Sequence, residues 1–555
     1  MPHDFLEAAP FNLAPADRDW VLSTFGRLTR QEKVAQLFVL ISVGNDPAEL
    51  ERLAKLQPAG ITRMFTPDVD HELAFIDAVN RLSDVPPLIS SDLEGSRMSL
   101  PFGTQVLNPL GLAAVDDVTV TQEVSRVMAQ EAAAVGINWT FTPVLDINAA
   151  FRSAIVATRG FGADVEVIEK HAMAQLETFQ AHGIAATVKH WPGEGYDDRD
   201  QHLVTTINPL DMDQWEAQFG RLYRAAVNAG VLSVMSAHIA LPSFVRSIHP
   251  EAGLEAYRPA SINQLLNIDL LRNRLGFNGL IVSDASEMAG LTSWCSAREA
   301  KVQIIANGCD IILFSQDPEA EMAAILAAVE SGTISQRRFD DAVLRVLGLK
   351  AALGLHRKPQ IVPATRKAQL ATTGNVALAR SATGRAPTLV KDIQNLMPLS
   401  VKLHRRILVF SGGIISPLHP QPFDFALPDL LRNEGFEVTL YTPQVEVTAE
   451  AFDLVLYLFG EETLLTRGRI FLDWARLGGN FVGAMQRYWH DIPTAMISFG
   501  YPYYLYDAPR VPTYINAYCT MDDMQCAVVD CLMGRRAWNQ NNPVDPFCGL
   551  EDALY

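Results

Sequence analysis

Eight short apolar runs recur between about residues 34 and 315, and each is followed by a polar loop and a helical segment. Continuous apolar runs are typical of parallel strands covered by helices on both faces. Eight successive strand–helix units predict a closed (β/α)8 barrel, a TIM-like α/β fold. The runs are VAQLFVLISV from Val34, AGITRMF from Ala59, PPLISSDLEG from Pro86, INWTFTPVLD from Ile137, IAATVKHWPG from Ile184, LSVMSAHIAL from Leu232, GLIVSDASEM from Gly279 and CDIILFS from Cys309, with amphipathic helices expected over 120–134, 165–181, 212–229 and 262–275.

A second α/β unit is expected after the barrel. The chain becomes polar and aperiodic and carries Pro359 and Pro363, which predicts a linker over 356–370. Strand-like and helical segments then alternate again, which predicts a parallel, doubly wound sandwich. We therefore expect a barrel domain over 1–355 and a sandwich domain over 371–555. The second set of segments is RILVFSGG from Arg406, LPDLLRNEGFEVTLYTP from Leu427, FDLVLYLFG from Phe452, TAMISFG from Thr494 and TYINAYC from Thr513.

The charge and the N-terminal sequence exclude several classes of protein. The chain has 45 Lys and Arg against 63 Asp and Glu, a net charge of −18, which disfavours binding to nucleic acid or anionic lipid. The N-terminus lacks a basic, then apolar, secretory signal, and no window approaches the roughly 18 apolar residues of a membrane span. Six cysteines without a CxxC pair predict neither a disulfide framework nor a zinc site. A cytoplasmic protein is expected.

The densest polar cluster follows the fifth run, where catalytic loops of a (β/α)8 barrel lie. It reads KHWPGEG from Lys189 and continues to Asp200 and His202. An aspartate two residues before a histidine can orient and polarise the imidazole, which then serves as a general acid at neutral pH. Taken alone, the stretch is also compatible with a solvated acidic loop that caps a helix.

Other strand ends carry further candidates. Asp284 ends the seventh run and is either a nucleophile or a helix cap. Asp92 follows the third run and Arg159 the fourth; such side chains hold sugar hydroxyls by paired hydrogen bonds, although surface ion pairs are their commoner use. A zinc site at His190, His202 and His238 is not favoured, because no metal-ligand spacing accompanies them.

In combination, these motifs resemble glycoside hydrolase family 3, and most closely its β-N-acetylglucosaminidase branch. The resemblance extends from about residue 30 to 535. The motifs are DLEGSR from Asp92, NWTFTPVLDIN from Asn138, TRGFG from Thr158, KHWPGEG from Lys189, DQH from Asp200, MSAHI from Met235, SDASEM from Ser283, TLVKD from Thr388, NLMPL from Asn395 and SFGYPYYL from Ser498.

The resemblance implies a role for each matching residue. Asp284 is expected to be the nucleophile, and His202 with Asp200 the general acid/base. The expected activity is release of nonreducing terminal β-linked N-acetylglucosamine, with retained configuration, through a covalent glycosyl-enzyme. Substrates would be amino-sugar oligosaccharides or muropeptides, and neither a cofactor nor a metal is implied. The positions implied to bind the sugar are Asp92, Arg159, Lys189 and His190.

Two departures from the family pattern keep alternatives open. Glu194 replaces a histidine of the family's loop, where it either shapes the loop, raises the pKa of His202 or contacts a sugar amine. Leu100 replaces an arginine, so one sugar donor is missing. The alternatives are a phosphorylase, since a neutral imidazole does not repel phosphate, a β-glucosidase or other β-hexosaminidase, and an inactive sugar-binding protein. Glu461 and Glu462 are the second-domain acids that would substitute for His202.

Overall fold

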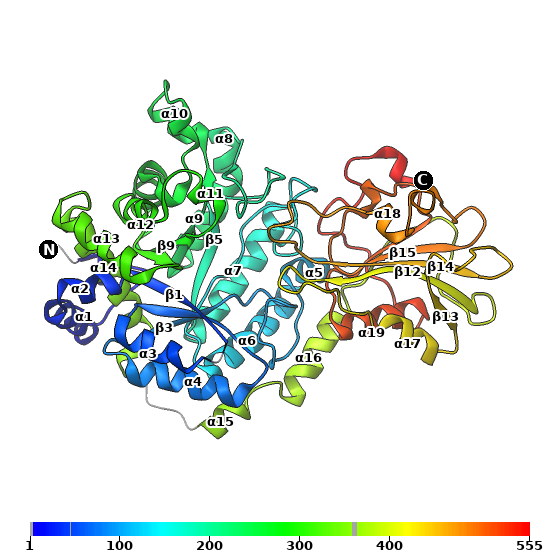
Figure 1. Cartoon of the computed structure of the whole chain (residues 1–555), viewed down its shortest axis with the longest axis horizontal. Coiled ribbons are helices and arrows are strands. Elements are labelled where there is room, and N and C mark those ends of the chain that lie inside the picture. The colour runs from blue at the N-terminus through cyan, green and yellow to red at the C-terminus, as the bar shows by residue number, and fades with distance from the viewer. Residues whose placement is uncertain (1–3, 45, 358–362) are drawn as a thin grey trace.

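The chain folds into two domains that lie side by side in a computed structural model describing residues 4–44, 46–357 and 363–555 (Figure 1). The N-terminal domain is drawn from blue to green, and the second domain from yellow to red. The helix α16 (Thr373–Thr383) lies where one domain passes into the other. No helix in the described part of the chain is both long and apolar enough to span a bilayer.

The first domain is the predicted eight-stranded parallel barrel. Its strands close in the order β1-β10-β9-β7-β5-β4-β3-β2. Trp139 lies inside the barrel, and its indole Nε1 donates to Thr187 Oγ1 at 2.8 Å and to Ser233 Oγ at 2.9 Å, so this buried layer is polar but satisfied. The strands are β1 (Phe38–Val43), β2 (Gly60–Met64), β3 (Leu88–Ser91), β4 (Trp139–Thr140), β5 (Ala185–Trp191), β7 (Ser233–Ser236), β9 (Leu280–Ala285) and β10 (Ile311–Leu313); β6 (Thr206–Ile207) and β8 (Ile239–Ala240) pair outside the barrel.

The helices largely follow the predicted segments, with two differences. The first apolar run begins inside a helix, because Thr29 caps α2 (Arg30–Ala35) and β1 starts only at Phe38. The segment predicted over 262–275 forms a π-helix, η5 (Leu265–Arg274). The other barrel helices are α1 (Pro15–Arg27), α3 (Pro47–Leu56), α4 (Val69–Leu82), α5 (Pro109–Val115), α6 (Val118–Val135), α7 (Val165–Ala181), α8 (Met212–Trp215), η2 (Glu216–Gly220), α9 (Arg221–Asn228), α10 (Pro242–Ile248), α11 (Ala289–Thr292), α12 (Ala297–Ala306), α13 (Pro318–Glu330) and α14 (Gln336–Ala352).

The second domain is a six-stranded sheet with helices, and it is mixed rather than wholly parallel. Its order is β11-β16-β15-β14-β12-β13, and β11 runs antiparallel to β16. The expectation of an all-parallel sheet was wrong for this strand, because an edge strand that precedes the wound unit needs no parallel crossover. The elements are β11 (Thr388–Asp392), β12 (Arg406–Ile415), α17 (Leu427–Asn433), β13 (Glu437–Leu440), β14 (Leu454–Glu461), α18 (Trp474–Leu477), β15 (Thr494–Ser498), β16 (Thr513–Asn516) and α19 (Asp522–Leu532).

The predicted linker over 356–370 includes residues 358–362, which lie outside the described part. The rest is not irregular throughout, because α15 (Pro363–Lys367) forms a helical turn. Arg366 anchors this turn to the barrel: its Nε donates to the carbonyl oxygen of Ala134 at 2.7 Å, and its Nη1 contacts Asp77 Oδ1 at 2.5 Å. The domain boundaries given from the sequence stay predictions.

The loop after β14 attaches the second domain to the mouth of the barrel. The main-chain nitrogen of Leu464 donates to the carbonyl oxygen of Ala154 at 3.1 Å. The main-chain nitrogen of Thr466 donates to Asp200 Oδ2 at 2.8 Å. The carboxyl ends of the barrel strands are therefore covered in part by the second domain.

Candidate active site

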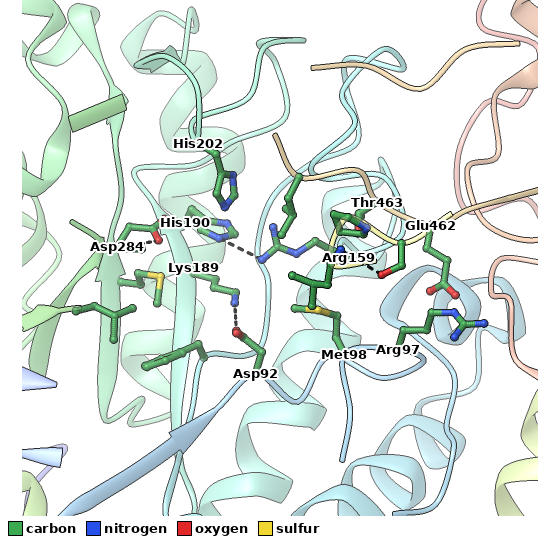
Figure 2. A pocket seen from close by; sticks show the side chains of 18 of the residues that line it. Asp92, Arg97, Met98, Arg159, Lys189, His190, His202, Asp284, Glu462 and Thr463 are labelled. Atoms are coloured by element: carbon green, nitrogen blue, oxygen red, sulfur yellow. Dashed lines mark hydrogen bonds and ion pairs between the residues drawn. The ribbon is translucent and has the colours of Figure 1, made fainter. Parts of the chain in front are cut away.

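A cavity of about 200 Å³ lies at the carboxyl ends of the barrel strands and is closed on one side by the second domain (Figure 2). Figure 2 shows Asp284 and His202 at one end of the labelled group and Arg97 and Glu462 at the other. The predicted nucleophile, Asp284, and the predicted sugar-binding residues all line this cavity, and so does His202. Asp200 is not in the lining but bonds to the His202 ring. The barrel contributes Asp92, Arg97, Met98, Phe141, Arg159, Lys189, His190, His202, Met235, Asp284, Ala285, Leu313 and Phe314, and the second domain contributes Ile415, Ser416, Pro417, Leu418, Glu462, Thr463, Leu465 and Thr520.

Asp284 stands at the end of β9 with one carboxylate oxygen uncommitted. Its Oδ1 accepts a 2.7 Å hydrogen bond from the main-chain nitrogen of Ala285, whereas Oδ2 is buried and has no partner among the described residues. Burial alone would raise the pKa of Asp284, but nearby histidines, chiefly His190, lower it below the ordinary aspartate value. The side chain is thus an ionised carboxylate with a free oxygen in the cavity.

His202 and Asp200 form a hydrogen-bonded dyad. Asp200 Oδ1 lies 2.7 Å from His202 Nδ1 and accepts a second bond, at 2.8 Å, from the main-chain nitrogen of His202. The other oxygen of Asp200 accepts from Thr466 of the second domain. Burial raises the pKa of Asp200, but the His202 contact outweighs it, so the pKa is lowered. An ionised Asp200 orients the ring so that Nε2 is the nitrogen available for proton transfer.

The cavity floor carries a buried network of two cations and two carboxylates. Arg159 donates to both oxygens of Glu94, from Nε at 2.8 Å and from Nη2 at 2.9 Å. Lys189 Nζ lies 2.7 Å from Glu94 Oε1 and 2.8 Å from Asp92 Oδ1. Burial raises the pKa of Glu94, but the two cations hold it well below the usual range. The two cations are thereby fixed at the cavity floor, where their N–H groups can donate to a polar ligand.

His190 is held by a second aspartate, Asp146. Its Nδ1 lies 2.6 Å from Asp146 Oδ2, and Asp146 Oδ1 accepts from the main-chain nitrogens of His190 at 3.1 Å and Glu194 at 3.0 Å. His190 Nε2 lies 3.5 Å from Arg159 Nη2. The aspartate therefore leaves the outer ring nitrogen of His190 directed toward Arg159.

Sequence reasoning missed Glu94, Asp146 and the second-domain lining. Glu94 lies two residues after the start of DLEGSR, and Asp146 lies eight residues after the start of NWTFTPVLDIN, both motifs already recognised. A carboxylate in a motif at a barrel strand end was therefore a signal that could have found them. No sequence signal places Thr520 or Leu418 against the barrel, because that contact depends on how the two domains pack.

The structure shows what Glu194 and Leu100 contact. Glu194 is buried, and its oxygens accept from Gln201 Nε2 at 2.8 Å and from Thr206 Oγ1 at 3.1 Å. It therefore shapes the loop that carries the dyad. Leu100 lies in the apolar core, so the position does not supply a donor. Arg97 lines the cavity instead, with its Nε 2.6 Å from Thr520 Oγ1.

The two second-domain acids lie in different places. Glu462 lines the catalytic cavity, but it accepts from Ser96 Oγ at 2.8 Å, Thr520 Oγ1 at 2.7 Å and the main-chain nitrogen of Thr520 at 2.8 Å. Glu462 therefore links Ser96 of the barrel domain to Thr520 of the second domain. Glu461 accepts from Tyr504 Oη at 2.5 Å and faces a separate cavity.

Asp146, His190 and Glu194 are close enough together to suggest a metal site. Their ligand atoms are already used, since both oxygens of each carboxylate accept hydrogen bonds and His190 Nδ1 bonds Asp146. His238 is also committed, with Nδ1 at 2.8 Å from Ser261 Oγ and Nε2 at 2.9 Å from the carbonyl oxygen of Ala285. The arrangement is that of a hydrogen-bonded loop.

We expect Glu94→Gln to lower the free energy of unfolding by about 3–5 kcal/mol, because buried Arg159 and Lys189 lose their shared counter-charge. The matched control is Glu434→Gln, which removes a solvent-accessible partner of Arg535 and is expected to cost no more than about 1 kcal/mol. Urea unfolding measures both. Because the pKa of Glu94 is lowered in the folded state, its contribution is complete at neutral pH and declines as the pH falls below about 4.3. Equal losses for the two variants would contradict the expectation.

The chain is similar to known glycosidases over its whole length. The model of the glycosyl hydrolase family 3 N-terminal domain matches residues 29–349. A β-N-acetylglucosaminidase/β-glucosidase of Cellulomonas fimi is 36% identical, covering 99% of both chains. A β-hexosaminidase of Vibrio cholerae is 33% identical over 46% of this chain and 73% of that protein.

Solved structures agree with the architecture. The structure of the β-glucoside phosphorylase BglX aligns with this one over 100% of each chain, at 31% sequence identity and a TM-score of 0.93. A β-N-acetylglucosaminidase of glycoside hydrolase family 3 from Paenibacillus sp. str. FPU-7 covers 94% of this chain and 100% of that one, at 24% identity and a TM-score of 0.79, which shows the shared fold. With the family model matching the barrel and a full-length relative at 36% identity, the chain belongs to glycosyl hydrolase family 3 and is a glycoside hydrolase.

Proposed function

We propose that this chain is a retaining exo-acting glycosidase that releases β-linked N-acetylglucosamine from nonreducing ends, with Asp284 as nucleophile and the His202–Asp200 pair as general acid/base. The observation that carries the proposal is the uncommitted Oδ2 of an ionised Asp284 in the same cavity as His202. A free carboxylate oxygen beside a proton donor is what two-step displacement at an anomeric carbon requires.

In the first step, Asp284 Oδ2 forms a bond to the anomeric carbon while the bond from that carbon to the aglycone oxygen breaks. The leaving oxygen takes the proton from His202 Nε2, and a glycosyl-enzyme forms. In the second step, the same nitrogen takes a proton from water, whose oxygen attacks the anomeric carbon and releases Asp284. Two inversions give overall retention. Asp92, Arg159, Lys189 and His190 orient the sugar ring through its hydroxyl groups.

The choice of sugar rests on the relatives. The full-length relative from Cellulomonas fimi is named for both N-acetylglucosaminidase and glucosidase activity, so the proposal extends to β-glucosides as second substrates. A muropeptide or amino-sugar oligosaccharide as natural substrate, and a cytoplasmic location, stay predictions.

Paired aryl β-glycosides test the proposal, an N-acetylglucosaminide against a glucoside with the same leaving group. We expect kcat/KM to be higher for the N-acetyl sugar and the first sugar product to have the β configuration, as followed by proton NMR. A product of inverted configuration would overturn the covalent mechanism. Equal or greater activity on the glucoside would overturn the preference for the N-acetyl sugar.

A second candidate, phosphorolysis, is favoured by the similarity to the β-glucoside phosphorylase BglX over the whole chain. In that variant, a phosphate oxygen replaces water in the second step and the product is a sugar 1-phosphate. An imidazole general base that is neutral in the glycosyl-enzyme does not repel the incoming anion as a carboxylate would. Turnover that rises with phosphate, with sugar 1-phosphate as product, would establish this variant; phosphate-independent release of free sugar would exclude it.

A further inference from the structure

A second cavity, of about 550 Å³, lies wholly in the second domain at the crossover point of its sheet. From the central strand β12 the chain first adds β13 on one side and then returns to add β14 on the other. In open α/β sheets, such a reversal leaves a crevice at the carboxyl ends of the two flanking strands, and ligands bind there. The cavity is lined by the end of β12, including Ser411 and Ile415, and by the end of β14, including Glu461.

The end of β12 presents open main chain to this cavity. The pairing of β12 with β14 changes register between Ser411 and Ile414, and Gly412 and Gly413 occupy this bulge. A Cβ atom at Gly412 would meet nothing within 4 Å, so packing does not require a glycine there. A glycine without a packing reason, beside a bulge at a strand end, is typical of a place where a ligand approaches the main chain.

The cavity is rich in arginine, although the chain as a whole carries a charge of −18. Arg467, Arg469 and Arg476 line it. Within the described residues, the guanidinium groups of Arg467 and Arg469 make neither a hydrogen bond nor an ion pair, whereas Arg476 Nη2 donates to the carbonyl oxygen of Gly412 at 3.3 Å. One oxygen of each carboxylate in the lining is already engaged: Asp473 Oδ1 accepts from the main-chain nitrogen of Arg476, and Glu461 Oε2 accepts from Tyr504 Oη.

We propose that this crossover cavity is a second ligand site, in which Arg467 and Arg469 bind the phosphate or carboxylate group of an anionic ligand. Planar guanidinium groups bind such oxyanions through paired hydrogen bonds. The ligand is either a free oxyanion or an acidic group carried on the aglycone of a glycoside. The second source is compatible with the geometry because Ile415 lines both this cavity and the catalytic cavity.

Calorimetric titration of the full chain with inorganic phosphate tests the free oxyanion. We expect Arg467→Ser/Arg469→Ser to weaken phosphate binding at least tenfold, and Gly412→Leu to do the same by filling the cavity from an unstrained position. The matched control, Arg298→Ser/Arg337→Ser, removes two exposed arginines from barrel helices and is expected to leave affinity within twofold. Undiminished phosphate binding in the Arg467/Arg469 variant would overturn the free-oxyanion form, because the phosphate would then bind elsewhere.

Two aryl β-N-acetylglucosaminides test the second source, one with a 4-carboxyphenyl and one with a neutral 4-carbamoylphenyl aglycone. If the site binds an acidic aglycone, the Arg467/Arg469 variant should raise KM for the acidic glycoside at least fivefold and leave the neutral one unchanged. The glycoside experiment rests on the proposed glycosidase activity, whereas the phosphate titration needs no turnover. Failure of the proposed activity can therefore be told apart from failure of the second ligand site. Absence of both effects would overturn the proposal.

Discussion

Replacing Asp284 by asparagine is expected to lower kcat/KM by about 10⁴-fold or more, because an amide cannot attack the anomeric carbon. The variant should fold normally, since the side-chain oxygen of asparagine can still accept the hydrogen bond from the main-chain nitrogen of Ala285. Steady-state kinetics with an activated aryl glycoside measure the loss, and thermal unfolding confirms that the fold is retained.

Chemical rescue separates loss of the nucleophile from a loss of structure. In Asp284→Gly, added azide is expected to fill the vacated space, attack from the same face and give an α-glycosyl azide. Recovery of turnover with an α-configured product identifies Asp284 as the attacking group. A variant that keeps more than a hundredth of the normal rate without added azide would show that another group is the nucleophile.

Removing His202 is expected to give the second largest loss, and one that depends on the leaving group. General acid catalysis contributes about 10²–10⁴-fold where the aglycone oxygen must be protonated. We therefore expect His202→Ala to reduce kcat/KM strongly for an alkyl or sugar aglycone and only slightly for dinitrophenolate, which departs without a proton. A series of aryl glycosides with different leaving-group pKa values measures this dependence.

Two comparisons make the His202 result specific. Asp200→Asn removes the ionised partner but leaves the ring, and is expected to show a smaller loss with the same dependence on leaving group. His249→Ala removes an exposed histidine elsewhere in the barrel domain and should have no effect. A uniform loss across all leaving groups in His202→Ala would show that His202 binds substrate instead of transferring a proton.

Much of the site could be predicted because its residues stand at strand ends. These residues come from four strand–loop units: Asp92 follows β3, Arg159 follows β4, Asp284 lies on β9, and β5 with its loop supplies Lys189, His190 and His202. Closure of a parallel barrel brings all such units to one mouth. Knowing the barrel was therefore enough to place them together. The Asp200–His202 pair is local in sequence, so its hydrogen bond could also be anticipated.

The contacts that the remaining residues make could not be predicted, because each contact joins distant parts of the chain. Glu94 was overlooked since its partners, Arg159 and Lys189, are 65 and 95 residues away, as the residue numbers show. Glu194 was open to three interpretations until its partners, Gln201 and Thr206, were known.

The sequence by itself determined the barrel, the second α/β domain and the candidate nucleophile and acid/base, since strand burial, helix periodicity and short motifs are local properties. Tertiary structure alone decided that Thr466 of the second domain holds Asp200, that Glu462 joins the domains, and that β11 runs antiparallel. It also decided that Arg467 and Arg469, which have no ion-pair partner among the described residues, line a cavity at the sheet crossover. These depend on docking of the two domains and on strand order, for which local patterns carry no signal because the contacts span the whole chain.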